Sequence, residues 1–298
     1  MKKIYSLILA LVFSVSMAIA QDATTTQETT EALKSKKGVL ILPETDEWGL
    51  GVSADPFLTY LGNFLNGNNF NSDPDFDYPS NPADNIALLG KLVKDANTFY
   101  RVRFNLNIGS NTNKAVISQD LLTPDPLAPA FTEDWRKTKF QSIVIAAGLE
   151  KRRGKTRLQG VYGGEVVLGF TNTVQEYQYG NPITIDFNVP TTFNFGSNIL
   201  PAGARKVEEK FGSNMLIGAR GFIGVEYFFA PKMSIGGEFG YMFGFERQGR
   251  AKITSEVWDS GTSNVRQIKT DYYNNSGLTS IEIGLDNLNG SINLLFYF

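Results

Sequence analysis

Charged residues that lie within otherwise apolar segments are the side chains of this 298-residue sequence most able to do chemistry. Arg101 and Arg103, like Arg220 and Glu226, are an even number of residues apart, so each pair shares one face of an extended strand. If these strands enclose a narrow interior, an unpaired ion inside it would be costly. We therefore expect the guanidinium groups and carboxylates on this face to pair with one another. Two roles remain open: a polar plug that sets strand register, or a gate along a narrow ion path. The candidates for this lumen charge network are Arg101, Arg103, Glu150, Glu165, Arg220, Glu226 and Glu238, with Glu282 as a further one.

The sequence has no histidine and no cysteine, which excludes several kinds of catalytic site and metal site. Without these residues there is no Ser-His-Asp mechanism, no thiol nucleophile, no disulfide and no metal site built on His or Cys. A calcium site is conceivable in residues 71–77 (NSDPDFD), where carboxylates alternate, but the segment lacks the Gly and final Glu of an EF-hand loop. We interpret it as a solvated turn and predict no catalytic residue, metal or cofactor.

Alternation of apolar and polar residues predicts β-strands through most of the chain. The composition fits this class, with 29 Gly, 22 Phe and 12 Tyr but only 19% charged residues. The pattern is clearest in Phe99–Ile108, Met215–Phe229 and Ser234–Glu246. Further strands are expected at Trp48–Ala54, Asn85–Val93, Phe140–Glu150, Arg157–Phe170 and Leu278–Phe298, which gives about eight.

The connections between these strands alternate between short and long. Tight polar turns are expected at 94–97, 152–155 and 230–232, and long connections near 62–84, 110–138, 172–212 and 248–277. This rhythm is typical of a transmembrane barrel, whereas a soluble sandwich would share the alternation but not the long loops. We therefore predict an all-β fold, an antiparallel up-and-down transmembrane β-barrel of about eight strands. Ten strands are the alternative, with Pro182–Val189 supplying one of the additional pair.

The larger apolar face of each strand is expected to contact lipid. Its clearest members are Tyr100, Phe104, Ile223, Phe239, Tyr241 and Phe243. In the last strand the apolar residues change parity, from Ile281 and Ile283 to Ile292 and Leu294, so we expect a bulge or break near Asn287. Two roles are open for the aromatic residues in or beside the long loops: contact with glycans or proteins, or a girdle at the membrane interface, which we favour. These residues are Trp135, Trp258, Tyr272 and Tyr273.

The chain begins with the pattern of an export signal. Lys2 and Lys3 precede an apolar run that ends in Ala18-Ile19-Ala20, a small-x-small cleavage site, so residues 1–20 are predicted to be a signal peptide. Residues 21–47 are expected to form a disordered leader and residues 48–298 the barrel. Removing two of the 28 basic residues changes the net charge from −2 to −4, which offers no basic surface for nucleic acid.

Two segments resemble known proteins. The chain ends in an amphipathic strand with a terminal aromatic residue, Phe298, which resembles the terminal signal of bacterial outer-membrane barrels. Together with Trp48–Asn63 (WGLGVSADPFLTYLGN), the ending Asp286–Phe298 (DNLNGSINLLFYF) resembles the small outer-membrane β-barrel proteins of Bacteroidetes-type bacteria, OmpA/OmpX-like barrels without a peptidoglycan-binding domain.

The resemblance implies a location in the cell outer membrane. It also implies contact with outer-membrane lipid and lipopolysaccharide, and recognition by the barrel-assembly machinery through the strand that ends at Phe298. Enzymes built on such small barrels use a catalytic His, which this chain lacks, so we expect no enzymatic activity. The expected function is a non-enzymatic structural or binding role of the long extracellular loops, with an unknown ligand. A small passive pore is the alternative.

Overall fold

The structure is a computed structural model that describes residues 33–53, 88–123, 127, 131–191, 195, 203–271, 279–285 and 291–298. Contacts divide the chain into Met1–Ala32 and Leu33–Phe298, and all described residues belong to the second unit. The expected signal peptide, the acidic segment 71–77, Tyr272 and Tyr273 therefore lie outside the described residues. No helix in the described part of the chain is both long and apolar enough to cross a membrane.

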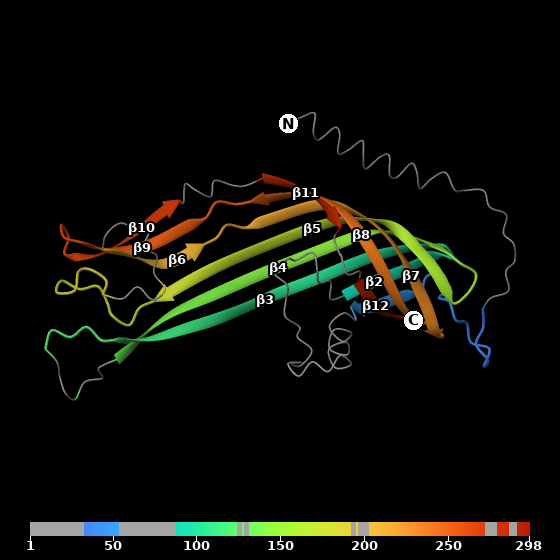
Figure 1. Cartoon of the computed structure of the whole chain (residues 1–298), viewed down its shortest axis with the longest axis horizontal. Helices are drawn as coiled ribbons and strands as arrows, with labels where there is room; N and C mark the ends of the chain where they lie inside the picture. Colours follow the sequence, from blue (N-terminus) through green and yellow to red (C-terminus); the bar gives the residue numbers. More distant parts are fainter. Residues whose placement is uncertain are drawn as a thin grey trace, which may run out of the picture. The chain divides into compact units, whose positions relative to one another are not determined.

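Eight antiparallel strands close into a ring of hydrogen bonds (Figure 1). This confirms the predicted all-β fold with eight strands, and the ring is consistent with an up-and-down β-barrel. The expected tight turns connect neighbouring strands of the ring, at residues 96–97, 154–157 and 231–232. In order around the ring, the strands are β1 (Trp48–Ser53), β2 (Leu88–Asp95), β3 (Thr98–Ser118), β4 (Phe131–Arg153), β5 (Leu158–Gln178), β7 (Asn214–Ala230), β8 (Met233–Gln248) and β12 (Ser291–Tyr297).

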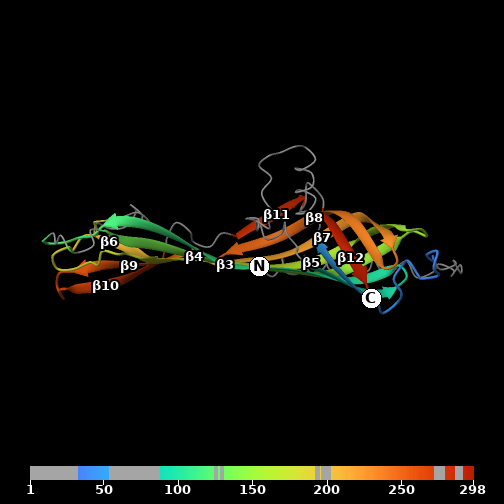
Figure 2. The same ribbon diagram turned by 90° about the horizontal axis from the view of Figure 1, so that it is seen from below.

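Three additional strands extend the sheet instead of enlarging the ring. They are β6 (Ala204–Lys210), β9 (Lys252–Asp259) and β10 (Asn264–Asp271), which pair in the order β5-β6-β9-β10. Strands β3, β4 and β5 continue past the ring to join them, as Figures 1 and 2 show, so the connections expected near 110–138, 172–212 and 248–277 are partly strand. We call this open six-stranded part the extension (β3-β4-β5-β6-β9-β10).

The ten-strand alternative is wrong, because residues 182–189 form no strand and the additional strands lie outside the ring. Hydropathy alternation does not reveal the extension strands, since β10 is exposed at nearly every position. A break at Gly212 separates β6 from β7. Its φ of 85° is one that L side chains rarely adopt, and a Cβ there would meet the carbonyl of Gly249.

The last strand is interrupted, as its change of parity predicts. Strand β11 (Thr279–Leu285) and β12 both pair with β8. Leu285 pairs with Tyr241, and Ser291 pairs with Glu238. From the first pair to the second, the sequence advances by six positions on one side but by only three positions along β8. The excess of three residues is an odd number, so it moves the following side chains to the opposite face. The excess itself lies in 286–290, outside the described residues.

Part of the expected disordered leader differs from that prediction. In Leu33–Glu47, Lys34 forms a bridge with Leu40, and the Lys232 amide donates to the Ile41 carbonyl at 3.0 Å. Ile41 is buried in an apolar cluster with residues of the ring. This lower cluster, at the turn end of the ring, consists of Ile41, Leu89, Val93, Phe99, Phe228, Leu295 and Tyr297.

Candidate functional site: an ion-pair network inside the ring

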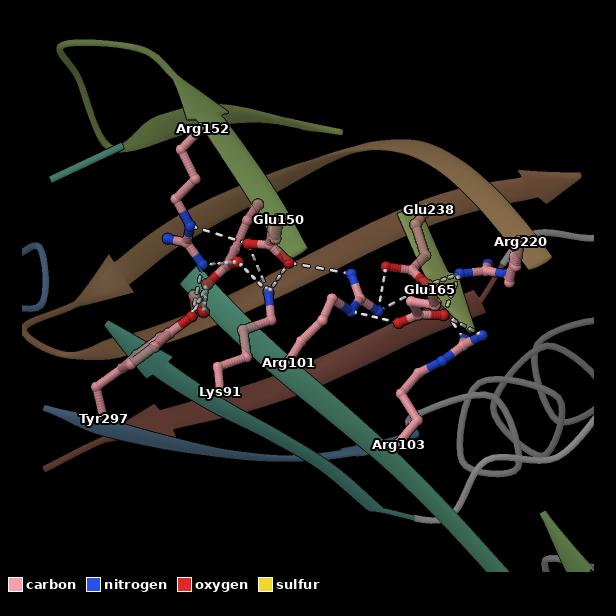
Figure 3. Close-up of polar contacts among 11 residues, drawn as sticks. Lys91, Arg101, Arg103, Glu150, Arg152, Glu165, Arg220, Glu238 and Tyr297 are labelled. Carbon is pink, nitrogen blue, oxygen red and sulfur yellow. Dashed lines mark hydrogen bonds and ion pairs between the residues drawn. The ribbon is translucent and has the colours of Figure 1, made fainter. Parts of the chain in front are cut away.

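All seven charged residues singled out by the sequence are buried and lie inside the ring. Their strands bring them together through the register: Arg101 pairs with Gly148, Gly148 with Glu165, and Glu165 with Arg220. Figure 3 shows the side chains converging from β2, β3, β4, β5, β7, β8 and β12. The structure therefore forms one network in which residues up to 145 positions apart in the sequence contact each other directly.

Arg101 is the centre of this network. Its guanidinium contacts three carboxylates, those of Glu150 at 3.0 Å, Glu165 at 2.6 Å and Glu238 at 3.0 Å. The centroid of the Phe222 ring lies 4.0 Å from the guanidinium carbon of Arg101, so the ring adds a cation–π contact. Three carboxylates around one guanidinium require additional cations, because unpaired carboxylates in a dry interior would be costly.

Arg103 and Arg220 supply two of those cations. Arg103 contacts Glu165 at 2.8 Å and Glu238 at 3.3 Å, and Arg220 contacts the same two carboxylates at 3.3 and 3.1 Å. Each of the two carboxylates is thus shared by three arginines. Glu282 pairs in register with Gly244 of β8, but its side chain lies outside the described residues.

Lys91 and Arg152 belong to the network although the sequence analysis missed them. Lys91 Nζ lies 2.8 Å from Glu150 and 3.0 Å from Glu226, and Arg152 lies 2.9 and 2.6 Å from the same carboxylates. The Tyr297 hydroxyl accepts from Arg152 at 2.7 Å and donates to Glu226 at 2.8 Å. Arg152 was assigned to a polar turn, yet its spacing of two from Glu150 places both on one face.

Glycines opposite the charged side chains leave room for them. Gly163 pairs with Glu150, and a Cβ at Gly163 would meet the Leu149 carbonyl and the Phe222 ring, the latter at 2.7 Å. Gly148 pairs with Glu165, and a Cβ there would lie 2.7 Å from the Glu165 Cα. The register therefore places a glycine opposite each of these two large ionic side chains.

Apolar clusters lie on both sides of the network along the strands. The lower cluster lies at the turn end of the ring. An upper cluster of Val144, Ala146 and Val167, with Leu216 and Met242 packed against it, lies toward the extension. Apolar neighbours exclude water, so the ion pairs between the two clusters are screened less than ion pairs in solvent.

The ionic side chains of the network are paired among themselves. Five basic side chains and four carboxylates contact one another in the described network, and their donors and acceptors are directed mainly at each other. No group of three His, Cys, Asp or Glu residues suited to a metal ion occurs in the described part of the chain. A cavity beside Lys91, Glu226 and Glu238 has a volume of about 10 Å³, room for roughly one water molecule.

Comparison with known proteins gives no match. No protein-family model matches the chain, and neither the curated proteins nor the solved structures contain a match.

Proposed function

We propose that this chain is an integral, non-enzymatic protein of the bacterial outer membrane. In this proposal the ring spans the membrane and is closed to solutes, and the extension serves a structural or binding role outside the cell. One observation carries the proposal: the ring is apolar and exposed on its outside and charged and buried on its inside. This is the reverse of a soluble protein, which places its apolar face inside.

The outward residues of β3 illustrate the apolar belt. Every second residue from Tyr100 to Ile108 is apolar and exposed. Eight residue steps of about 3.3 Å extend about 26 Å along the strand. With the usual tilt of about 40°, this corresponds to a height of about 20 Å, close to the apolar band of outer-membrane barrels. The six residues expected to face lipid are all exposed and outward: Tyr100, Phe104, Ile223, Phe239, Tyr241 and Phe243.

The belt ends at one level on neighbouring strands. Ile108 pairs with Gln141, which pairs with Asn172, so the outward residues become polar on β4 and β5 where the apolar run of β3 ends. Beyond this level the outward face carries exposed ion pairs, Lys139 with Glu176 at 2.5 Å and Lys114 with Glu133 at 2.8 Å. A common boundary is what a flat membrane surface requires.

The interior supports a closed ring rather than a pore. An interior of eight strands is just wide enough for side chains to fill. Here the ion pairs occupy it between two apolar clusters, and a solute would have to separate them. The passive pore is therefore the less supported of the two functions.

The extension has the rigidity that a binding or structural platform needs. The Asn181 amide donates to the Ser118 carbonyl at 2.9 Å and accepts from the Asp120 amide at 3.0 Å, which fastens the segment after β5 to the end of β3. The Arg205 guanidinium donates to the Asn181 carbonyl at 2.7 Å and lies 4.2 Å from the Tyr179 ring. Trp135 and Trp258 lie on extension strands, and Trp135 is six residues past the belt edge at Gln141, so these two are not positioned as an interface girdle.

Membrane fractionation of cells that express the full chain tests the proposal. The protein should remain with the outer membrane after alkaline carbonate and urea washes. Its electrophoretic mobility should change on boiling, because closed barrels resist unfolding by detergent at room temperature. Recovery in the soluble periplasmic fraction without detergent would contradict the proposal.

A further inference from the structure

The turn between β4 and β5 carries five basic residues within seven positions, 151–157, and no acidic residue. Only Arg152 enters the ion-pair network, where Glu150 and Glu226 neutralise it. Lys151 donates to the Thr98 hydroxyl at 2.8 Å and Arg157 to the Phe228 carbonyl at 3.2 Å. Both acceptors are uncharged, so these two bonds leave the positive charges of Lys151 and Arg157 in place.

The basic side chains continue the outward apolar stripe. Lys151 and Arg153 follow Ala147 and Leu149 at the same parity of β4, so they are on the side of the strand that forms the belt. Arg153 is exposed and pairs in register with Gly160, which has no side chain to cover it.

The neighbouring turn adds a further cation at the same level. The Arg152 amide donates to the Asn97 carbonyl at 2.8 Å, which joins the β2–β3 turn to the β4–β5 turn. Near the end of β2, the exposed Lys94 Nζ lies 5.6 Å from the ring centroid of Tyr100, the first outward residue of the belt on β3. These cations therefore lie where the apolar belt ends, which is the depth of lipid headgroups in a membrane.

The opposite edge of the belt differs in charge. There the outward cations Lys114 and Lys139 each contact a carboxylate. The two edges are thus asymmetric: Lys114 and Lys139 are paired near the extension, whereas the turn segments 94–97 and 151–157 hold six basic residues and one acidic residue, Asp95.

We infer that the basic turn surface, formed by Lys94, Lys151, Arg153 and Lys155, binds the phosphate groups of anionic phospholipids in the membrane leaflet at the turn end. The inference rests on the proposed membrane location. Each Lys or Arg near an anionic lipid surface strengthens the attraction about fivefold, provided that it lies within a Debye length. Four cations fixed by two short hairpins retain this advantage without the ordering cost of a flexible tail.

Lipid-specific quenching tests the inference on the full mature chain. Because the protein has no cysteine, Ala96→Cys introduces a single dye site in the exposed β2–β3 turn. In vesicles that contain equal fractions of nitroxide-labelled phosphatidylglycerol or phosphatidylcholine, the anionic lipid should quench the dye more strongly. The excess should disappear in Lys94→Gln/Arg153→Gln/Lys155→Gln and in about 1 M salt, where the Debye length is about 3 Å. The matched control Lys137→Gln/Lys139→Gln, on β4 beyond the other belt edge, should keep the excess.

The outcomes separate this inference from the proposed function. Equal quenching by both lipids in the wild type, or an excess that the triple variant keeps, would overturn the inference while the membrane location stands. Equal quenching together with charge-dependent retention on purified peptidoglycan would overturn it in favour of a cell-wall ligand. A dye that neither lipid quenches, on protein that washes off the vesicles, would contradict the membrane location itself.

Discussion

At the scale of single residues, the buried charges determine most of the behaviour that we expect of the ring. Glu150 illustrates the reason, because its carboxylate contacts Lys91, Arg101 and Arg152 at 2.8–3.0 Å and is fully buried. Such a group stabilises its partners only while all of them are present. Removing one member of a buried ion pair leaves the others uncompensated, which costs far more than the pair contributes.

We expect Glu150→Gln to lower the free energy of unfolding by about 3–5 kcal/mol, since three cations lose a shared carboxylate. The matched control is Glu133→Gln, which breaks an ion pair whose side chains are 61% and 50% exposed and should cost about 0–1 kcal/mol. Urea unfolding of the protein in vesicles, followed by tryptophan fluorescence, measures both. Equal costs for the two variants would show that the network is not buried in the folded protein.

Tyr177, on an extension strand, should make the stability of the extension sensitive to alkaline pH. Burial and the neighbouring Glu209 raise the pKa of Tyr177 to about 12, and Arg136 opposes this in part. The folded state therefore favours the neutral phenol, and the stabilisation is present below the usual tyrosine pKa of about 10 and is lost as the pH rises toward 12. Limited proteolysis of the extension should accelerate over this range, and less so in Tyr177→Phe. Identical pH profiles for wild type and Tyr177→Phe would contradict the expectation.

At the scale of elements, β3 carries two kinds of outward surface on one strand. Val102 and Val116 have the same side chain, the same parity and exposures of 48% and 69%, but only Val102 lies in the apolar belt. In water both positions would tolerate a charge equally. In a membrane they differ.

We therefore expect Val102→Arg to destabilise the protein by about 1–2 kcal/mol, between the cost of an arginine at the membrane interface and its cost at the midplane, because Val102 lies two residues from the turn-end edge of the belt. Val116→Arg should have little effect. Folding yield into vesicles and the urea midpoint of the folded fraction measure the difference. A small effect of both substitutions would indicate that the belt faces water.

The strands of the ring could be predicted because one face of each is mainly apolar within the ring, as in β7 and β8. The same parity argument located seven network residues, but Lys91 escaped because its strand has Leu on both faces, and Arg152 because it adjoins a turn. The extension strand β10 was missed because it is exposed at nearly every position and so has no buried apolar face. The burial of Ile41 depends on ring residues distant in sequence, which no local pattern indicates.

At the scale of the whole molecule, a ring filled by side chains continues into the open extension. The lower cluster, the ion pairs and the upper cluster follow one another along the strands, so any route through the ring would cross all three. In the function that we propose, ligands bind outside the interior of the ring, at the extension or at the basic turns. The ring supplies position and stability.

Single-channel recording on the full mature chain in planar bilayers tests the central claim most directly. Insertion is first verified in the same preparation by resistance to carbonate extraction and by the mobility change on boiling, so that silence is informative. We predict no stable conductance, because ion pairs and two apolar clusters fill the interior. Stable, salt-dependent channels in the wild type, with a conductance altered by Arg103→Ala or Glu238→Ala, would contradict the closed ring.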